Sequence, residues 1–324
     1  MKRAHLKPLL RHVTFRQLQI FAAVVRNGSY TRAAEELYLA QPTISIQMKK
    51  LADVVGLPLF EQNGRDIRAT DAGQDLLAAC QELFLIFDDL DTRIADRKGI
   101  RRGRLRLGVV TTAKYIAPEL LAAFGARYPG IEFSMNVNNR DEIITRLRNN
   151  QDDLYVMGQI PDNDVDVEAF PFADNPLTIM VNRGHPLART PSPVPLAAIA
   201  EAPFLIREFG SGTRHAYLNL FAEKGLKPNI VMELGSNEAI KHAIVSGLGV
   251  SILSIHCLAL EGTSGPIQIL HAEGLPILRK WYLVYPRGRR LSLTAQKFLE
   301  FSATQQDFIA RRLIDLWPDL SRYL

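Results

Sequence analysis

The feature that most constrains this chain is a helical apolar repeat that runs without a break from residue 71 to residue 98. Its apolar positions alternate at spacings of four and three: Ala72, Leu76, Ala79, Leu83, Ile86, Leu90 and Ile94. At ~1.5 Å per residue, such a helix is roughly 40 Å long. It could pack on its own neighbouring domain or on a second chain, and the preceding segment is too small to cover the whole stripe. We therefore expect a linker helix at 71–98 that dimerises the protein.

Chain length and charge distribution indicate different modules on the two sides of this helix. A chain of 324 residues is long enough for two or three compact domains. Residues 1–70 contain 11 Lys and Arg against 5 Asp and Glu, whereas residues 71–98 contain 3 against 7. A positive excess confined to the first segment indicates an N-terminal module that binds a polyanion.

Residues 14–69 have the pattern of three short helices followed by a β-hairpin. Thr14 opens a capping box at the start of the first helix, and the third helix ends at Gly56. Two short extended runs then flank Asn63-Gly64, a dipeptide typical of hairpin turns. We predict a winged helix-turn-helix over 1–70, in which residues 1–13 form a basic extension.

The third helix, "QPTISIQMKKLADVV", has one apolar stripe and an unusually polar back. Ile44, Met48, Leu51 and Val55 fall on the core side. The other faces carry short donors, acceptors and two lysines, which a recognition helix needs at its amino end, and an exposed Ile46 could lie against a thymine methyl. The predicted DNA contacts are Arg32, Gln41, Pro42, Thr43, Ser45, Ile46, Gln47, Lys49 and Lys50, with Arg65 and Arg68 on the wing.

A solvated helix face with one stray surface isoleucine is the alternative interpretation, and for a lone helix it would be preferred. The adjoining hairpin and the localised positive charge favour DNA binding instead.

From residue 104 the pattern changes to alternating strands and helices, which predicts a mostly parallel sheet with crossover helices. A second unit of the same kind begins near "LTIMVN", "RKWYLVYP" returns to the first unit, and "SLTAQKFLEFSATQQDF" reads as a final helix. The fold class is α/β overall. The expected effector domain covers 104–303, with lobe I at about 104–173 and 280–303, lobe II at about 174–279, and a C-terminal extension at 304–324.

Two such lobes leave a cleft where strands end and helices begin. Hydroxyl, amide and guanidinium groups gather at these positions, and Arg binds phosphate or carboxylate bidentately. Each arginine could equally form an ordinary salt bridge, but jointly the set favours an anionic small molecule. The candidate ligand-binding residues are Thr111, Thr112, Asn139, Arg140, Arg207, Ser211, Thr213, Arg214, Ser236 and Asn237.

An enzyme or a solute-binding protein could use the same cleft. The sequence contains no P-loop, HExxH or G-x-S-x-G motif, so we predict no catalytic residue, no metal site and no cofactor. No apolar run approaches the ~18 residues of a membrane span, and the N-terminus lacks the apolar region of a secretory signal. With only two cysteines, Cys80 and Cys257, a reduced cytoplasmic location fits best.

The N-terminal segment resembles the LysR-type transcriptional regulators. "SYTRAAEEL", "AQPTIS", "GLPLFEQ" and "TDAG" occur in order and at the family's spacing. "GRLRLGVVTT", "REFGSGTR" and "GSNEAIKHAIVSGLGVSILS" resemble the family's effector domain, which has the periplasmic-binding-protein type of fold. Family members often carry Arg, Gln or another polar residue where this chain has Ile46, so the base preference there departs from theirs.

The resemblance implies a bacterial cytoplasmic regulator that binds double-stranded DNA, with RNA polymerase as a further partner. It also implies dimerisation through 71–98 and assembly as a tetramer. "NNRDEI" and "DLYVMGQIP" are most similar to the regulators of RuBisCO operons, the CbbR group. That subgroup implies a phosphorylated metabolite or NADPH as the effector. A LysR-type regulator of another metabolic operon is the alternative.

Overall fold

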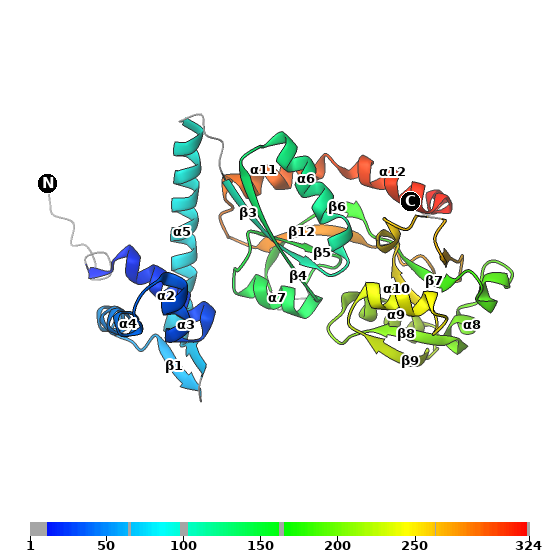
Figure 1. Ribbon diagram of the computed structural model, residues 1–324, viewed down its shortest axis with the longest axis horizontal. Coiled ribbons are helices and arrows are strands. Elements are labelled where there is room, and N and C mark those ends of the chain that lie inside the picture. Colours follow the sequence, from blue (N-terminus) through cyan, green and yellow to red (C-terminus); the bar gives the residue numbers. More distant parts are fainter. Residues whose placement is uncertain (1–11, 64–65, 98–102, 162–164, 263, 323–324) are drawn as a thin grey trace. The chain divides into compact units, whose positions relative to one another are not determined.

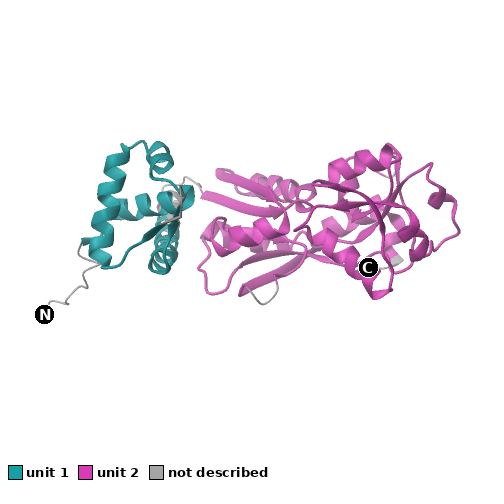
Figure 2. Cartoon of the chain, turned by 90° about the horizontal axis from the view of Figure 1, so that it is seen from below, with its two compact units in different colours: residues 1–90 teal, residues 91–324 magenta. Residues whose placement is uncertain are grey.

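The computed structural model describes residues 12–63, 66–97, 103–161, 165–262 and 264–322. Its contacts divide the chain into two compact units, residues 1–90 and 91–324 (Figure 2). The division falls inside α5, Asp71–Arg97, which is the long helix expected from the apolar repeat.

Within the described residues, the first unit contains three helices and a hairpin, as the sequence predicts, followed by most of α5. The capping box is formed: the Thr14 amide donates to Gln17 Oε1 at 2.9 Å, and the Gln17 amide donates to Thr14 Oγ1 at 3.2 Å. One buried cluster, which includes Phe21, Ile44 and Leu51, holds the helices together. The elements are α2 (Phe15–Asn27), α3 (Tyr30–Leu37), α4 (Gln41–Val55), and the antiparallel pair β1 (Phe60–Asn63) and β2 (Asp66–Ala69).

α5 packs on the first unit from its amino end as far as Phe84 and Phe87, whose rings contact that of Phe15. Cys80 is fully buried in that unit's core, and Leu76 is partly buried against it. Farther along the helix, four of the predicted stripe residues are exposed in the single chain: Leu83, Ile86, Leu90 and Ile94.

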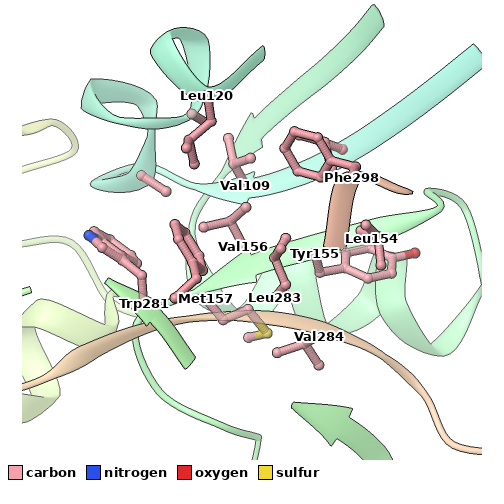
Figure 3. Close-up of a cluster of buried hydrophobic side chains, with 14 of the residues drawn as sticks. Val109, Leu120, Leu154, Tyr155, Val156, Met157, Trp281, Leu283, Val284 and Phe298 are labelled. Carbon is pink, nitrogen blue, oxygen red and sulfur yellow. The ribbon is translucent and has the colours of Figure 1, made fainter. Parts of the chain in front are cut away.

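The second unit contains two lobes (Figure 1). Lobe I is built on a five-stranded sheet with the order β4–β3–β5–β12–β6. Its core joins the sheet to two helices through side chains such as Val109, Leu283, Leu120 and Phe298 (Figure 3). The elements are β3 (Gly103–Val110), α6 (Ala117–Arg127), β4 (Ile131–Asn138), α7 (Arg140–Arg148), β5 (Leu154–Met157), β6 (Val167–Asp174), β12 (Lys280–Pro286) and α11 (Leu293–Ala303).

This sheet is mixed, so the expectation of a mostly parallel sheet is wrong for its second half. β3 is parallel to β4 and β5, but β12 is antiparallel to both β5 and β6. The sequence pattern does not predict β6 because Pro171 interrupts it. β6 is the edge strand, where a residue without an N–H is tolerated.

Lobe II is also mixed. β7 pairs antiparallel with β10 and β11, and β8 pairs parallel with β9. A bridge between Phe204 and Val250 links these two sets of strands. The elements are β7 (Leu177–Asn182), α8 (Leu196–Glu201), β8 (Pro203–Arg207), α9 (Gly212–Glu223), β9 (Asn229–Leu234), α10 (Asn237–Val245), β10 (Ser251–Ser254), the short 3₁₀ helix η3 (Ile255–Leu258) and β11 (Ile267–Ile269).

The C-terminal segment forms two helices, and the first of them ends before residue 308, the predicted end of the final helix. α11 ends at Ala303, and α12 (Gln306–Leu316) and the 3₁₀ helix η4 (Pro318–Arg322) follow. The break lies at Thr304, whose amide and hydroxyl both donate to the Phe301 carbonyl, at 2.9 and 2.6 Å. Side chains of this type compete with the helix for backbone groups.

Candidate functional site

The amino-terminal part of α4 presents an exposed polar face. Ile44, Met48 and Leu51 are buried as predicted, whereas Ile46 is 54% exposed. Of the predicted DNA contacts on this helix, Gln41, Pro42, Thr43, Lys49 and Lys50 are exposed, and Ser45 and Gln47 are half-buried.

The start of α4 is suited to an anion. Its N-cap residue, Ala40, makes no side-chain hydrogen bond, and no acidic residue lies in the first turn. The Gln41 backbone N–H and the positive end of the helix dipole are therefore available to a phosphate group, whereas Pro42 has no N–H and the Thr43 N–H donates to the Ala40 carbonyl at 2.9 Å. Gln41 Nε2 donates to Ser45 Oγ at 2.9 Å, which orients both side chains.

The predicted cations of this unit are free of ion pairs within the described residues. Lys49, Lys50, Arg32 on α3 and Arg68 on β2 are all exposed, and none has a carboxylate partner there. Cations that are not neutralised by the protein are suited to phosphate contacts. Arg65, the other predicted wing residue, lies outside the described residues.

A second candidate site is a small cleft in the second unit. Lobe I contributes residues from the ends of β3 and β5 and from the start of α7, and lobe II contributes the loop that leads into α9. Its lining residues are Val110, Thr111, Thr112, Arg140, Met157, Gly158, Gln159, Asn175, Ser211, Gly212, Thr213 and Arg279. Five of the ten predicted ligand-binding residues are therefore brought together: Thr111, Thr112, Arg140, Ser211 and Thr213.

Two guanidinium groups give this cleft its positive charge. Burial, and then repulsion from the Arg140 guanidinium, lower the pKa of Arg279 to about 10. Arg279 donates to the Gly212 carbonyl at 3.1 Å and to Gln159 Oε1 at 3.4 Å, and within the described residues it has no carboxylate partner. Two repelling cations in a partly buried cleft favour an anionic ligand.

The backbone comes close to these arginines at two glycines. A Cβ atom on Gly212 would lie 3.2 Å from Arg140 Cδ, and one on Gly158 would lie 3.1 Å from Asn175 Nδ2. Because glycine has no side chain, the backbone can approach closely here, and the guanidinium groups occupy the space that a Cβ atom would take.

Arg207 lies behind the cleft rather than in its lining. It is fully buried, and its guanidinium donates to Thr111 Oγ1 in lobe I at 3.0 Å, to Glu208, and to Asn237 Oδ1. Since Thr111 Oγ1 accepts this hydrogen bond, its own proton is left for a partner in the cleft.

The other four predicted residues, Asn139, Arg214, Ser236 and Asn237, are not in the cleft lining either. Asn139 caps α7 and accepts from the Glu142 amide at 3.0 Å, and Ser236 caps α10 and accepts from the Ala239 amide at 3.1 Å. Arg214 pairs with Glu233 at 2.6 Å and donates to the Arg207 carbonyl at 2.8 Å.

Further polar groups tie the lobes together beside the cleft. Tyr115, which follows Thr112 in lobe I, donates to Glu238 of α10 at 2.5 Å. The Tyr115 ring is partly buried against lobe II residues such as Ile240. The two lobes are thus in direct contact at several side chains around the cleft.

Sequence reasoning missed Arg279, Gln159 and Asn175. Arg279 precedes a strand instead of following one, and only the antiparallel direction of β12 brings it to the carboxyl ends of β3 and β5. Within the described residues no group of His, Cys, Asp and Glu is arranged to hold a metal ion, and no helix is long and apolar enough to span a membrane.

Comparison with known proteins gives two matches to family models. Residues 98–307 match the LysR substrate binding domain, and residues 15–74 match the bacterial regulatory helix-turn-helix protein of the lysR family. The chain belongs to the LysR family of transcriptional regulators. The winged helix-turn-helix and the two-lobed α/β domain are the two modules of this LysR-type regulator.

Similar proteins include transcriptional regulators of RuBisCO operons. This LysR-type regulator is 46% identical over 292 residues to the HTH-type transcriptional activator CmpR of Synechocystis. The match covers 90% of this chain and 95% of that protein. It is 41% identical to a RuBisCO operon transcriptional regulator of Acidithiobacillus ferrooxidans, and the match covers 90% of this chain and 94% of that protein. A solved structure, the Synechocystis CcmR regulatory domain in complex with 2-PG, has a TM-score of 0.60 and 45% identity, and covers 63% of this chain and 97% of that one.

Proposed function

We propose that this LysR-type regulator controls carbon-dioxide-fixation genes in response to a small phosphorylated acid that binds in the cleft between Arg140 and Arg279. The observation that carries the proposal is that Arg279 lies in the cleft, close to a second guanidinium, without a carboxylate partner in the described residues. An anion that reaches both groups relieves their repulsion.

The cleft is small, which favours a compact ligand. The hydroxyl groups of Thr112, Ser211 and Thr213 can orient phosphate or carboxylate oxygens beside the arginines. The relative with 2-PG bound supports a small acid, and we favour it over NADPH, which is much larger.

The target genes are inferred from the relatives. A RuBisCO operon regulator that is 41% identical over most of its length supports control of carbon-fixation genes, with another metabolic operon as the alternative. We assign operator recognition to α4, phosphate contacts to its unpaired cations, and the bacterial cytoplasm as the place of action. Contact with RNA polymerase stays a prediction.

Self-association follows from α5. Leu83, Ile86, Leu90 and Ile94 leave an apolar stripe exposed, and a second copy of the same helix covers it best. Two copies place two recognition helices on two half-sites. We propose a dimer through α5 that assembles further into a tetramer.

Regulation requires that the ligand bind one arrangement of the lobes better than others. The cleft draws residues from both lobes, Arg140 from one and Ser211 and Thr213 from the other. A ligand that touches all of them stabilises the arrangement in which the lobes are close. That preference can pass through the linker helices to the DNA-binding units.

The test is a gel shift with the DNA upstream of the neighbouring operon, with and without 2-phosphoglycolate. We expect binding that weakens steeply with salt, because phosphate contacts release counterions. We also expect the ligand to change the affinity or the pattern of shifted bands. Failure to bind any such fragment at low salt would contradict the DNA-binding assignment, and binding that is insensitive to phosphorylated acids would contradict the effector assignment.

A further inference from the structure

The C-terminal segment 306–322, made of α12 and η4, contacts both lobes. Figure 1 shows α12 continuing from α11 past β6 toward lobe II. The match to the effector-domain family model ends at residue 307, so most of this segment lies outside the matched part.

The first half of the segment is anchored in lobe I. Ile309 is buried in the same cluster as the side chains of the lobe I sheet. Gln306 Nε2 donates to the Pro171 carbonyl of β6 at 3.3 Å, and Arg312 forms an ion pair with Glu119 of α6.

The second half is anchored in lobe II. Leu313, Trp317 and Leu320 form a buried cluster with Ile255. The ring centroids of Trp317 and His271 are 5.1 Å apart, and His271 Nε2 lies 3.0 Å from Asp319 Oδ2.

The lobe II anchor adjoins the strands that cross between the lobes. The chain passes from β6 to β7 at 174–177 and from lobe II back to β12 near 277–280. The Ile255 amide donates to the Pro176 carbonyl at 3.1 Å, and the Asn175 amide donates to the Arg279 carbonyl at 2.7 Å. The segment therefore lies against the place where a rotation between the lobes has to occur.

A rigid helix that packs on both lobes cannot keep its contacts with both of them if the lobes rotate apart. Ile309 and Leu313 are one turn apart on the same face of α12, and one belongs to the lobe I cluster while the other belongs to the lobe II cluster. A rotation about the crossing strands must draw one of these side chains out of its cluster.

We propose that residues 306–322 act as a strap that restrains rotation between the lobes and so limits how far the cleft opens. The restraint comes from buried apolar anchors at both ends and from one polar pair to each lobe. It acts whether or not the cleft holds a ligand, so it goes beyond the proposed function and does not depend on it.

The test is amide hydrogen exchange on the full-length protein, at the crossing segments 174–177 and 277–280. Trp317→Ala removes the largest lobe II anchor and leaves Ile309 in place. We expect exchange in both crossing segments to become about tenfold faster, because local opening follows the loss of buried contacts. Phe308→Ala is the matched control: this residue is on the same helix but is 60% exposed, so exchange should not change.

Two outcomes would overturn the strap. One is faster exchange confined to 306–322, and the other is an equal effect of Phe308→Ala. If Trp317→Ala does not fold, the double variant Arg312→Gln/Asp319→Ala decides, because it removes one polar contact to each lobe and leaves the apolar anchors. Faster exchange at 174–177 in that variant supports the strap, and unchanged exchange overturns it.

Discussion

Burial and the neighbouring Arg140 hold the pKa of Arg279 near 10, so Arg279 is cationic at neutral pH. The Arg140 guanidinium repels it, and an anion bound between the two groups offsets this repulsion. The same residue pair therefore accounts for both the sign of charge and the position of the proposed ligand.

His256 gives a prediction for stability against pH. Burial lowers its pKa to about 4, and its Nε2 lies 2.9 Å from the Asp174 carbonyl, to which it must donate. In the unfolded chain His256 has its ordinary pKa of 6.5, so between pH 6.5 and 4 the unfolded chain binds a proton that the folded protein does not. The stabilisation by neutral His256 is therefore present above pH 6.5 and is lost as the pH falls toward 4. At pH 5.5 the loss is on the order of 1 kcal/mol.

Denaturant unfolding of the wild type and of His256→Gln at pH 7.5 and 5.5 measures this loss. Glutamine keeps a donor for the Asp174 carbonyl but does not titrate, so the variant should lose less stability between the two pH values. An identical loss in both proteins would show that His256 does not contribute.

Ile46 gives a prediction for DNA recognition. Since it is 54% exposed, Ile46→Ala should change the free energy of unfolding by only about 0.5 kcal/mol or less. It should alter the preference at one operator position by roughly 1 kcal/mol, through a lost apolar contact with a base. Competition binding with each base at each operator position measures this, and Lys49→Ala, which should weaken all sequences alike, is the control. If the variant changes only the stability and not the base preference, Ile46 does not contact a base.

At the residue scale, the sequence predicted which polar residues lie at the starts of helices better than it predicted which groups they contact. Asn139, Ser211 and Ser236 all precede helices, and all three cap them. Only Ser211 also lines the cleft. A polar residue before a helix can cap the helix or bind a ligand, and the sequence pattern is the same in both cases. Arg279 could not be found because its position depends on strand direction, which a residue pattern does not contain.

At the scale of elements, α5 has a partly buried amino end and an exposed apolar stripe beyond it. Burying that stripe in a coiled pair is the simplest way to remove it from water. The carboxyl half of α5 is therefore expected to carry most of the dimer contacts.

Leu90→Glu should weaken the dimer, because Leu90 is 47% exposed in the single chain and lies in the middle of the exposed stripe. Burying the new carboxylate in the pair would be costly. Sedimentation over a range of concentrations should show dissociation at concentrations where the wild type stays associated. Asp75→Asn, an exposed change outside the stripe, is the control, and an unchanged mass of Leu90→Glu would place the interface elsewhere.

Element boundaries followed the local signals where these were strong. The capping box at Thr14 and the glycine at residue 56 mark helix ends correctly. The predicted final helix over 292–308 runs past the end of α11 because the apolar spacing continues across Thr304, and the break depends on the hydrogen bonds from the Thr304 amide and hydroxyl to the Phe301 carbonyl.

At the scale of the whole molecule, one chain combines a DNA-binding unit with a two-lobed ligand-binding unit, and both were predictable from motifs and from strand–helix alternation. The contacts that unite the lobes were not, since Arg207 with Thr111, Tyr115 with Glu238 and the C-terminal strap each join residues far apart in sequence. These contacts determine which lobe arrangements are open to a ligand.

The central claim is tested most directly by titration calorimetry of the full-length protein with 2-phosphoglycolate. The wild type should bind it saturably, and Arg279→Gln should bind it at least about tenfold more weakly, because a charged hydrogen bond is lost. Arg287→Gln, which alters an exposed arginine paired with Asp166 outside the cleft lining, should match the wild type. Equal affinity of Arg279→Gln and wild type, or no saturable binding by the wild type, would contradict the anion site.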